Sequence, residues 1–212
     1  AAAAVQQALA QWLAFRALLN ESVDTVVQGG FANSAVVQAV ARSAEDLYVA
    51  VEGISSSLRV AAESAGAYLS GLLVDIAARQ RTLIQRICKV ALLVAHSVNL
   101  GQSRAILQEV SSLYEESREG IVFGIRVAGV PALTEMCTMR QMREVSFYYQ
   151  QVRPFTREIL NAQSNSEASR IASAVVANMS TFVDPLYSAM VEAVKLYVND
   201  TGSCNPFATT TF

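Results

Sequence analysis

The sequence is poor in the residues that interrupt helices. Its 212 residues include only four prolines and ten glycines, and no runs of alternating apolar and polar residues stand between turn signals. With 52% hydrophobic residues and a mean hydropathy of +0.31, the chain can bury one or two sizeable cores and lacks the composition of a disordered segment. We therefore expect an ordered, all-α protein.

An excess of one charge sign is also lacking. Sixteen basic and eighteen acidic residues give a formal net charge of -2 and a pI near 5.5. Binding to nucleic acid requires a basic surface that neutralises phosphates. We therefore expect no nucleic-acid partner.

Long uncharged apolar runs are absent too. No stretch reaches eighteen such residues, and the N-terminal AAAAVQQALAQW lacks the basic start of a signal peptide. We expect the chain as given to be soluble, either mature or excised, and to meet a membrane only through flanking segments.

Histidine and cysteine are too scarce for metal or nucleophile chemistry. His96 is the single histidine and has no second histidine or cysteine at helical spacing, so we expect a packing or surface residue. The three cysteines match no zinc spacing, and no nucleophile stands with a base. The sequence thus predicts no enzyme activity, no metal and no cofactor.

Three sequons are present instead. They are Asn20 (NES), Asn178 (NMS) and Asn199 (NDT), each chemically able to accept a glycan in a secreted eukaryotic protein. They favour an extracellular or periplasmic, cell-surface location.

The few breakers divide the chain into long helical stretches. They are QGGF (28–31), NLGQS (99–103), RVAGVP (126–131) and QSNS (163–166). Helices are predicted near 2–28, 31–98, 102–124, 132–162 and 167–199. The second would be a near-continuous helix of about 100 Å, with Gly53 and Gly66 as candidate break points.

A self-comparison accounts for that length. AEDLYVAVEGI (44–54) resembles VDPLYSAMVEAV (183–194) at an offset of 139, and WLAFRALLN (12–20) resembles VRPFTREILN (152–161) at an offset of 140. Residues 1–61 would then be the last two helices of one module, 62–200 a complete four-helix module, and 201–212 a tail. The long helix would join the two modules.

Residues 74–93, VDIAARQRTLIQRICKVALL, place basic residues on an otherwise apolar helix. At about 100° per residue, one seam contains Ile76, Gln80, Leu83, Ile87, Val90 and Val94. A second apolar strip contains Ala77, Ile84, Cys88 and Ala95, so this helix has two interfaces. We expect oligomerisation through this second strip or through helices 1–60.

Two interpretations of the arginines are open. Arg79 and Arg86 flank the seam and could be structural, since an antiparallel hairpin brings Arg86 level with Glu115 and Glu116. Arg81 and Gln85 lie at the outer edge of the second strip, away from their own bundle, where an anion could bind.

The same stretch closely resembles the pattern INxAGRQRMLSQRxAKxALL of the PilJ-type sensor module. This is the extracytoplasmic four-helix domain of type IV pili chemotaxis transducers, similar to the nitrate/nitrite sensor domain of NarX-like histidine kinases. ILQEVSSLYEESREGI resembles the second helix of that module, VRPFTREIL and QWLAFRALL its third, and DPLYSAMVEAVKLY its closing LLKAMNxAVKLYE. The resemblance covers 62–198 fully and 5–60 in part.

The resemblance implies an elongated antiparallel four-helix bundle preceded by a two-helix half-module. It also implies a ligand-binding site, because in the nitrate sensors an arginine from each subunit grips the anion at a dimer axis. By position that residue is Arg81, with Gln85, Arg79 and Arg86 as further candidates. Asp75, Ala78 and Ile84 depart from the pattern.

Two functions follow. The first is an extracellular ligand-sensing domain of a signalling receptor, which binds a small anion or other small molecule at a first-helix dimer interface. The second is a structural subunit of a filament, coat or appendage, built from PilJ-like modules that associate through helix faces.

The cysteines give one further expectation within this arrangement. The fourth helix of the module runs antiparallel to the third, and Gly202 lets the tail turn back. We therefore expect a disulfide between Cys137 and Cys204, with Cys88 a free thiol on an apolar strip.

Overall fold

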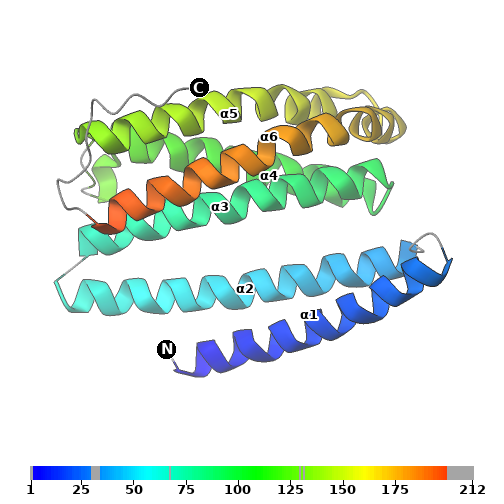
Figure 1. The fold of residues 1–212 in the computed structure, drawn as a ribbon, viewed down its shortest axis with the longest axis horizontal. Helices are drawn as coiled ribbons and strands as arrows, with labels where there is room; N and C mark the ends of the chain where they lie inside the picture. Colours follow the sequence, from blue (N-terminus) through cyan, green and yellow to red (C-terminus); the bar gives the residue numbers. More distant parts are fainter. Residues whose placement is uncertain (1, 30–33, 67, 129, 131, 200–212) are drawn as a thin grey trace. The chain divides into compact units, whose positions relative to one another are not determined.

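Most of the described part of the chain is helical. The computed structural model describes residues 2–29, 34–66, 68–128, 130 and 132–199. Within these residues six α-helices and one short 3-10 helix follow one another, which confirms the all-α expectation (Figure 1). The helices form two compact units, Ala1–Tyr68 and Leu69–Phe212.

The first unit is an antiparallel helical hairpin. Helix α1 spans Ala2–Gly29 and α2 spans Ser34–Ser64 (Figure 1). Both sequences are rich in alanine, and α1 is also rich in leucine and glutamine; these residues lose little side-chain freedom in a helix. Ala8 and Ala50 are buried, as expected for small residues where helices approach closely.

The near-continuous helix predicted for 31–98 is interrupted at Gly66, one of the two predicted break points. Helix α2 ends at Ser64, and Ala65 and Gly66 form a turn before α3 begins at Tyr68. Gly66 adopts φ +76°, and its N–H donates to the Glu63 carbonyl at 3.0 Å, which caps the end of α2. Only glycine enters this left-handed region without strain, so one residue ends the helix.

The second unit packs four helices antiparallel. They are α3 (Tyr68–Ala95), α4 (Leu100–Phe123), α5 (Met136–Asn161) and α6 (Asn165–Asn199). Between α4 and α5 lie the 3-10 helix η1 (Arg126–Ala128) and a bridge between Ile125 and Val130. Gly120 of α4 allows this connection to lie close, since a Cβ there would stand 2.8 Å from Ile125 Cγ1.

Side-chain hydrogen bonds tie the ends of these helices together. Ser169 and Ser173 of α6 each donate to the Ala95 carbonyl at the end of α3, at 3.1 Å. Arg104 of α4 donates to the carbonyls of Leu160 and Ala162 at 3.0 and 2.7 Å. These carbonyls have no partner within α5 itself, so Arg104 caps that helix.

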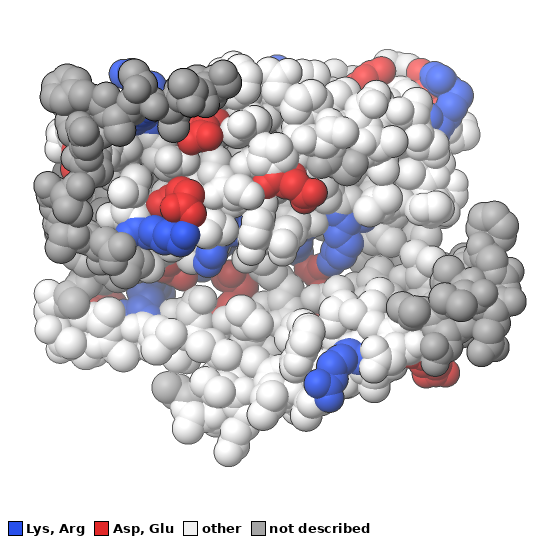
Figure 2. Space-filling model, in the orientation of Figure 1, with Lys and Arg blue, Asp and Glu red and all other residues white. Residues whose placement is uncertain are grey.

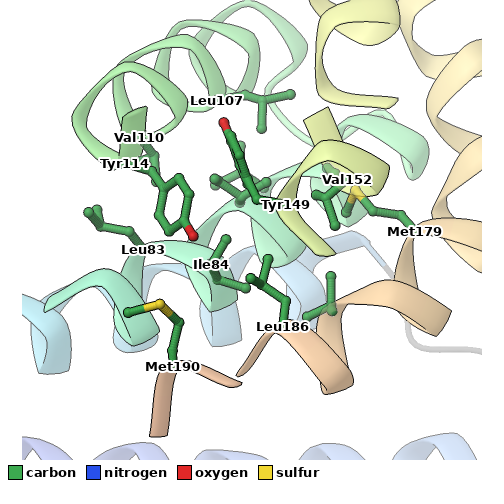
Figure 3. Packing of buried hydrophobic residues seen from close by; sticks show 14 of the residues in the cluster. Leu83, Ile84, Leu107, Val110, Tyr114, Tyr149, Val152, Met179, Leu186 and Met190 are labelled. Carbon is green, nitrogen blue, oxygen red and sulfur yellow. The ribbon is translucent and has the colours of Figure 1, made fainter. Parts of the chain in front are cut away.

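The core of the second unit draws on all four helices (Figure 3). The predicted seam of α3 is confirmed from Gln80 to Val94, whose side chains are buried. Tyr114 of α4 and Tyr149 of α5 lie with ring centroids 4.4 Å apart, and Leu186 and Met190 of α6 approach from the opposite side. Among the described residues, no helix has the length and apolarity needed to cross a membrane.

Candidate functional site

Helix α3 distributes its basic side chains over two edges instead of gathering them. Leu83 and Ile87 are buried and mark the core-facing side. At about 100° per residue, Arg79 and Arg86 fall on one flank of that side, and Arg81 falls on the other. The predicted ligand-binding residues therefore form two groups, and Arg81 stands apart with Gln85.

Arg79 has a local structural partner. Its Nη2 lies 3.4 Å from Asp75 Oδ2, one helical turn earlier, and the two side chains are 41% and 14% exposed. Such an i, i+4 pair contributes about 0.3–0.5 kcal/mol to stability. Asp75 thus belongs to the Arg79 edge and does not face Arg81 across the helix.

Arg81 shares with Arg79 and Arg86 a buried Nε that has no hydrogen-bond partner, and it differs from Arg79 in lacking an ion pair such as the one with Asp75. Its side chain is half-buried, and its Nε is buried with no hydrogen-bond partner. Gln85, one turn further along the same edge, is exposed. An unbonded, buried guanidinium N–H is a donor whose desolvation cost only an added acceptor can offset.

The second apolar strip of α3 is partly covered within the chain. Ala77 and Ile84 are fully buried in the core of the second unit, and Ile84 lies beside Leu186 of α6 (Figure 3). Cys88 is close enough to Asp184 of α6 for that charge to act on its thiol. Helix α6 therefore covers the Ile84 part of this strip within one chain, and oligomerisation through the strip or through helices 1–60 stays a prediction.

The predicted polar residue of the seam has a partner. Gln80 is fully buried and donates through Nε2 to Ser117 Oγ of α4 at 3.2 Å, while its Oε1 accepts no bond. The Tyr114 hydroxyl is also buried without a partner and points among Leu83, Ile84 and Met190 (Figure 3). Burial, with a smaller contribution from Tyr149, raises the pKa of Tyr114 strongly, so the phenol stays neutral.

A charge cluster between α4 and α5 was missed from the sequence. Glu115 accepts two bonds from Arg153, at 2.7 and 3.0 Å, and a third from the Tyr149 hydroxyl at 3.1 Å. Burial alone would raise the pKa of Glu115, but these bonds and the charges of Arg153 and Arg157 outweigh it and lower the pKa. Glu115, one of the two partners predicted for Arg86, is therefore tied to α5.

Only some of the predicted cysteine and glycosylation sites lie among the residues that the structure describes. Cys137 is disulfide-bonded and Cys88 is a free thiol, whereas the predicted partner Cys204 lies outside the described residues. Asn20 and Asn178 are exposed on α1 and α6. The side chain of Asn199 lies outside the described residues, so its use stays a prediction.

Charged side chains of both signs are interspersed on the face drawn in Figure 2, and no broad patch of one sign forms there. In the part of the chain that the structure describes, no cluster of three histidine, cysteine or acidic residues could hold a metal ion. We therefore take Arg81 with Gln85 as the candidate site, because Arg81 has a buried, unbonded Nε and no ion pair such as that of Arg79 with Asp75.

Comparisons with known proteins add no family. No family model matches the sequence, and no curated protein and no solved structure matches it either.

Proposed function

We propose that the chain is an extracellular ligand-sensing helical-bundle domain of a signalling receptor, in which Arg81 binds a small anion between first helices of two copies. The resemblance of residues 74–93 to the PilJ-type motif suggests the position. The Nε of Arg81 is buried and unbonded, as are those of Arg79, Arg86 and Arg118, and Arg81 has no ion pair such as that of Arg79 with Asp75; this combination supports the proposal.

Two other arginines of the second unit show how a guanidinium is hydrogen-bonded in this fold. Arg153 binds both oxygens of Glu115, and Arg104 binds two carbonyls. Arg81 makes no such bond in the structure, although a guanidinium offers five donors in a planar fork. A planar anion such as nitrate or a small carboxylate has the matching geometry.

Two copies of Arg81 at one axis would repel each other, and a shared anion would relieve the repulsion. Binding would then draw together the α3 helices, whose buried seam is continuous with the rest of the bundle. A displacement of α3 relative to α6 is the simplest signal such a site could send, because α3 carries the arginine and α6 covers the Ile84 part of its second strip.

The test is a thermal unfolding series at constant ionic strength, with nitrate, formate or acetate replacing chloride. An anion that binds only the folded protein adds about 2.7 kcal/mol at one hundred times its Kd. The melting temperature should rise in the wild type and in Arg79→Ala, the control on the opposite edge. It should not rise in Arg81→Ala.

A flat response of the wild type to all of these anions would contradict the proposal. So would a rise that Arg81→Ala retains, because the anion would then act elsewhere.

A structural role is the second candidate, and a different observation favours it. Large apolar side chains are exposed along α1 and α2, as expected for a surface that associates. Negative-stain microscopy of concentrated protein separates the two functions, because a filament or coat subunit should form regular assemblies without added anion.

A further inference from the structure

One face of helix α1 carries an apolar stripe that solvent reaches. Val5, Leu9 and Trp12 follow one another at intervals of four and three residues and are 50%, 55% and 44% exposed. Residues at this spacing share one side of a helix. Arg16, one turn after Trp12, ends the stripe with a charge.

Helix α2 carries a matching stripe. Leu47, Val51, Ile54 and Leu58 have the 4-3-4 spacing of a helix face. Val51 and Leu58 are exposed, and the other two are half-buried. None of the four positions of this stripe holds a charged residue.

Both stripes lie on the same side of the hairpin. Each is rotated forward by about 40° to 100° from its buried alanine, Ala8 in α1 and Ala50 in α2. Because the helices run antiparallel, equal rotations from the shared contact line turn both stripes to one face. Counting from the joint between Gly29 and Ser34, Trp12 is level with Val51, so the stripes form one apolar patch.

The sequence repeat shows what such a patch meets elsewhere in the chain. The counterparts of Val5, Leu9 and Trp12, 140 residues later, are Val145, Tyr149 and Val152 of α5. The counterparts of Leu47, Val51 and Ile54, 139 residues later, are Leu186, Met190 and Ala193 of α6. All six are buried in the core of the second unit, on the hairpin that α3 and α4 cover.

We propose that this patch, Val5–Leu9–Trp12 with Leu47–Val51–Ile54–Leu58, binds the same patch of a second copy of this chain. Two α1–α2 hairpins then form a four-helix bundle with a two-fold axis. In any copy α3 and α4 are already engaged with α5 and α6, so the hairpin that a second copy can offer is its own α1–α2.

One substitution argues against an α4-like partner. Arg153 of α5 binds Glu115 of α4, but the corresponding position of α1 holds Leu13, which is exposed. An α4-like helix would bring a carboxylate to a leucine. An uncharged patch fits an uncharged copy of itself better, and the α1–α2 part of the face in Figure 2 is mostly uncharged.

The available area is sufficient for a stable dimer. The patch itself, 12 residues long in α2, covers about 18 Å by about 20 Å, or about 360 Å²; the whole face of the hairpin of 28-residue helices, which a two-fold bundle would bury, offers about 800 Å² per copy. This is the area that one partner buries in a standard-size protein interface.

The test is the molar mass of the full chain in solution, by sedimentation or light scattering between about 1 and 100 μM. The wild type should be a dimer at the upper concentrations. Leu9→Glu combined with Val51→Glu places charges at the centre of the patch of each copy and should weaken association by at least about 100-fold. Phe147→Glu, at an exposed phenylalanine of α5, is the matched control and should stay dimeric.

Far-UV circular dichroism should show the same helix content in all three proteins, because glutamate is well tolerated in an exposed helix. If the double variant loses helix, Leu9→Gln and Val51→Gln replace it. A wild type that is monomeric at 100 μM overturns the proposal, as does a double variant that dimerises like the wild type. These outcomes are independent of the anion response of Arg81, which is read as a melting temperature.

Discussion

Helix α1 exposes the apolar spacing that helix α5 buries. Trp12 is 44% exposed, and its counterpart Val152 is completely buried. Both helices form, so the spacing specifies the helix and its apolar face, while the partner helices decide whether that face is covered. The two hairpins also differ in their joints. An offset of 140 maps the α5–α6 joint at 162–164 onto positions 22–24, but α1 continues to Gly29.

The comparison is tested most strongly by placing the same charge at equivalent positions. Met190→Glu puts a carboxylate into the core of the second unit and should lower the free energy of unfolding by at least about 4 kcal/mol. Val51→Glu should change it by no more than about 0.5 kcal/mol.

Urea denaturation of dilute protein measures both variants, since dilution removes the contribution of association. Equal losses would mean that the patch on α2 is covered within one chain.

Removing the Arg153–Glu115 contact, which has no counterpart in α1, should have an intermediate effect on the free energy of unfolding. Arg153→Met removes both bonds to Glu115 and should cost about 1–2 kcal/mol near neutral pH. Because the folded-state pKa of Glu115 is lowered, its stabilisation is present above the ordinary value of 4.5 and is lost as the pH falls.

The difference between wild type and Arg153→Met should therefore shrink below about pH 4.5 in unfolding curves measured from pH 7 to pH 3. Leu13→Ala, at the corresponding position of α1, is the control and should show no such pH dependence. A constant difference for Arg153→Met across this range would refute the role given to the ion pair.

The smallest effect is expected at the junction of the two units. Gly66→Ala forces a side chain into a positive φ and should cost about 1 kcal/mol. Gly53→Ala, inside α2 with open space where the added Cβ would lie, should instead stabilise the fold by about 0.5–1 kcal/mol. Opposite signs in thermal unfolding would confirm that one glycine ends α2 and the other does not.

The helices and the core seam of α3 were predictable because they depend on local spacing. The turn at Gly66 was not, because Gly53 and Gly66 are equal candidates until the backbone conformation of each is known. Ile84 was assigned to an oligomer interface for a related reason. A helical projection shows that α3 has two apolar sides, but only the packed structure shows that α6 covers the Ile84 part of the second.

The candidate site, too, was predictable from the sequence only in part. The outward edge that holds Arg81 follows from residue spacing alone, and the structure adds that its Nε has no acceptor. The Glu115–Arg153 contact joins residues 38 apart in sequence, and nothing in either local motif indicates that they meet. The expected antiparallel hairpin offered Glu115 as a partner of Arg86, but the side-chain geometry of the structure pairs Glu115 with Arg153.

The reactivity of the free thiol of Cys88 depends on how closely α3 and α6 pack. Burial, reinforced by the negative charge of Asp184, raises the pKa of this thiol to about 11, so very little reactive thiolate exists at neutral pH. Separation of α3 from α6 would expose the half-buried Cys88 further and remove it from Asp184, so we expect a thiol reagent to modify it faster in that state. The rate of Cys88 modification therefore measures how often α3 and α6 separate. A ligand that shifts α3 should change this rate, and no engineered label is needed to observe it.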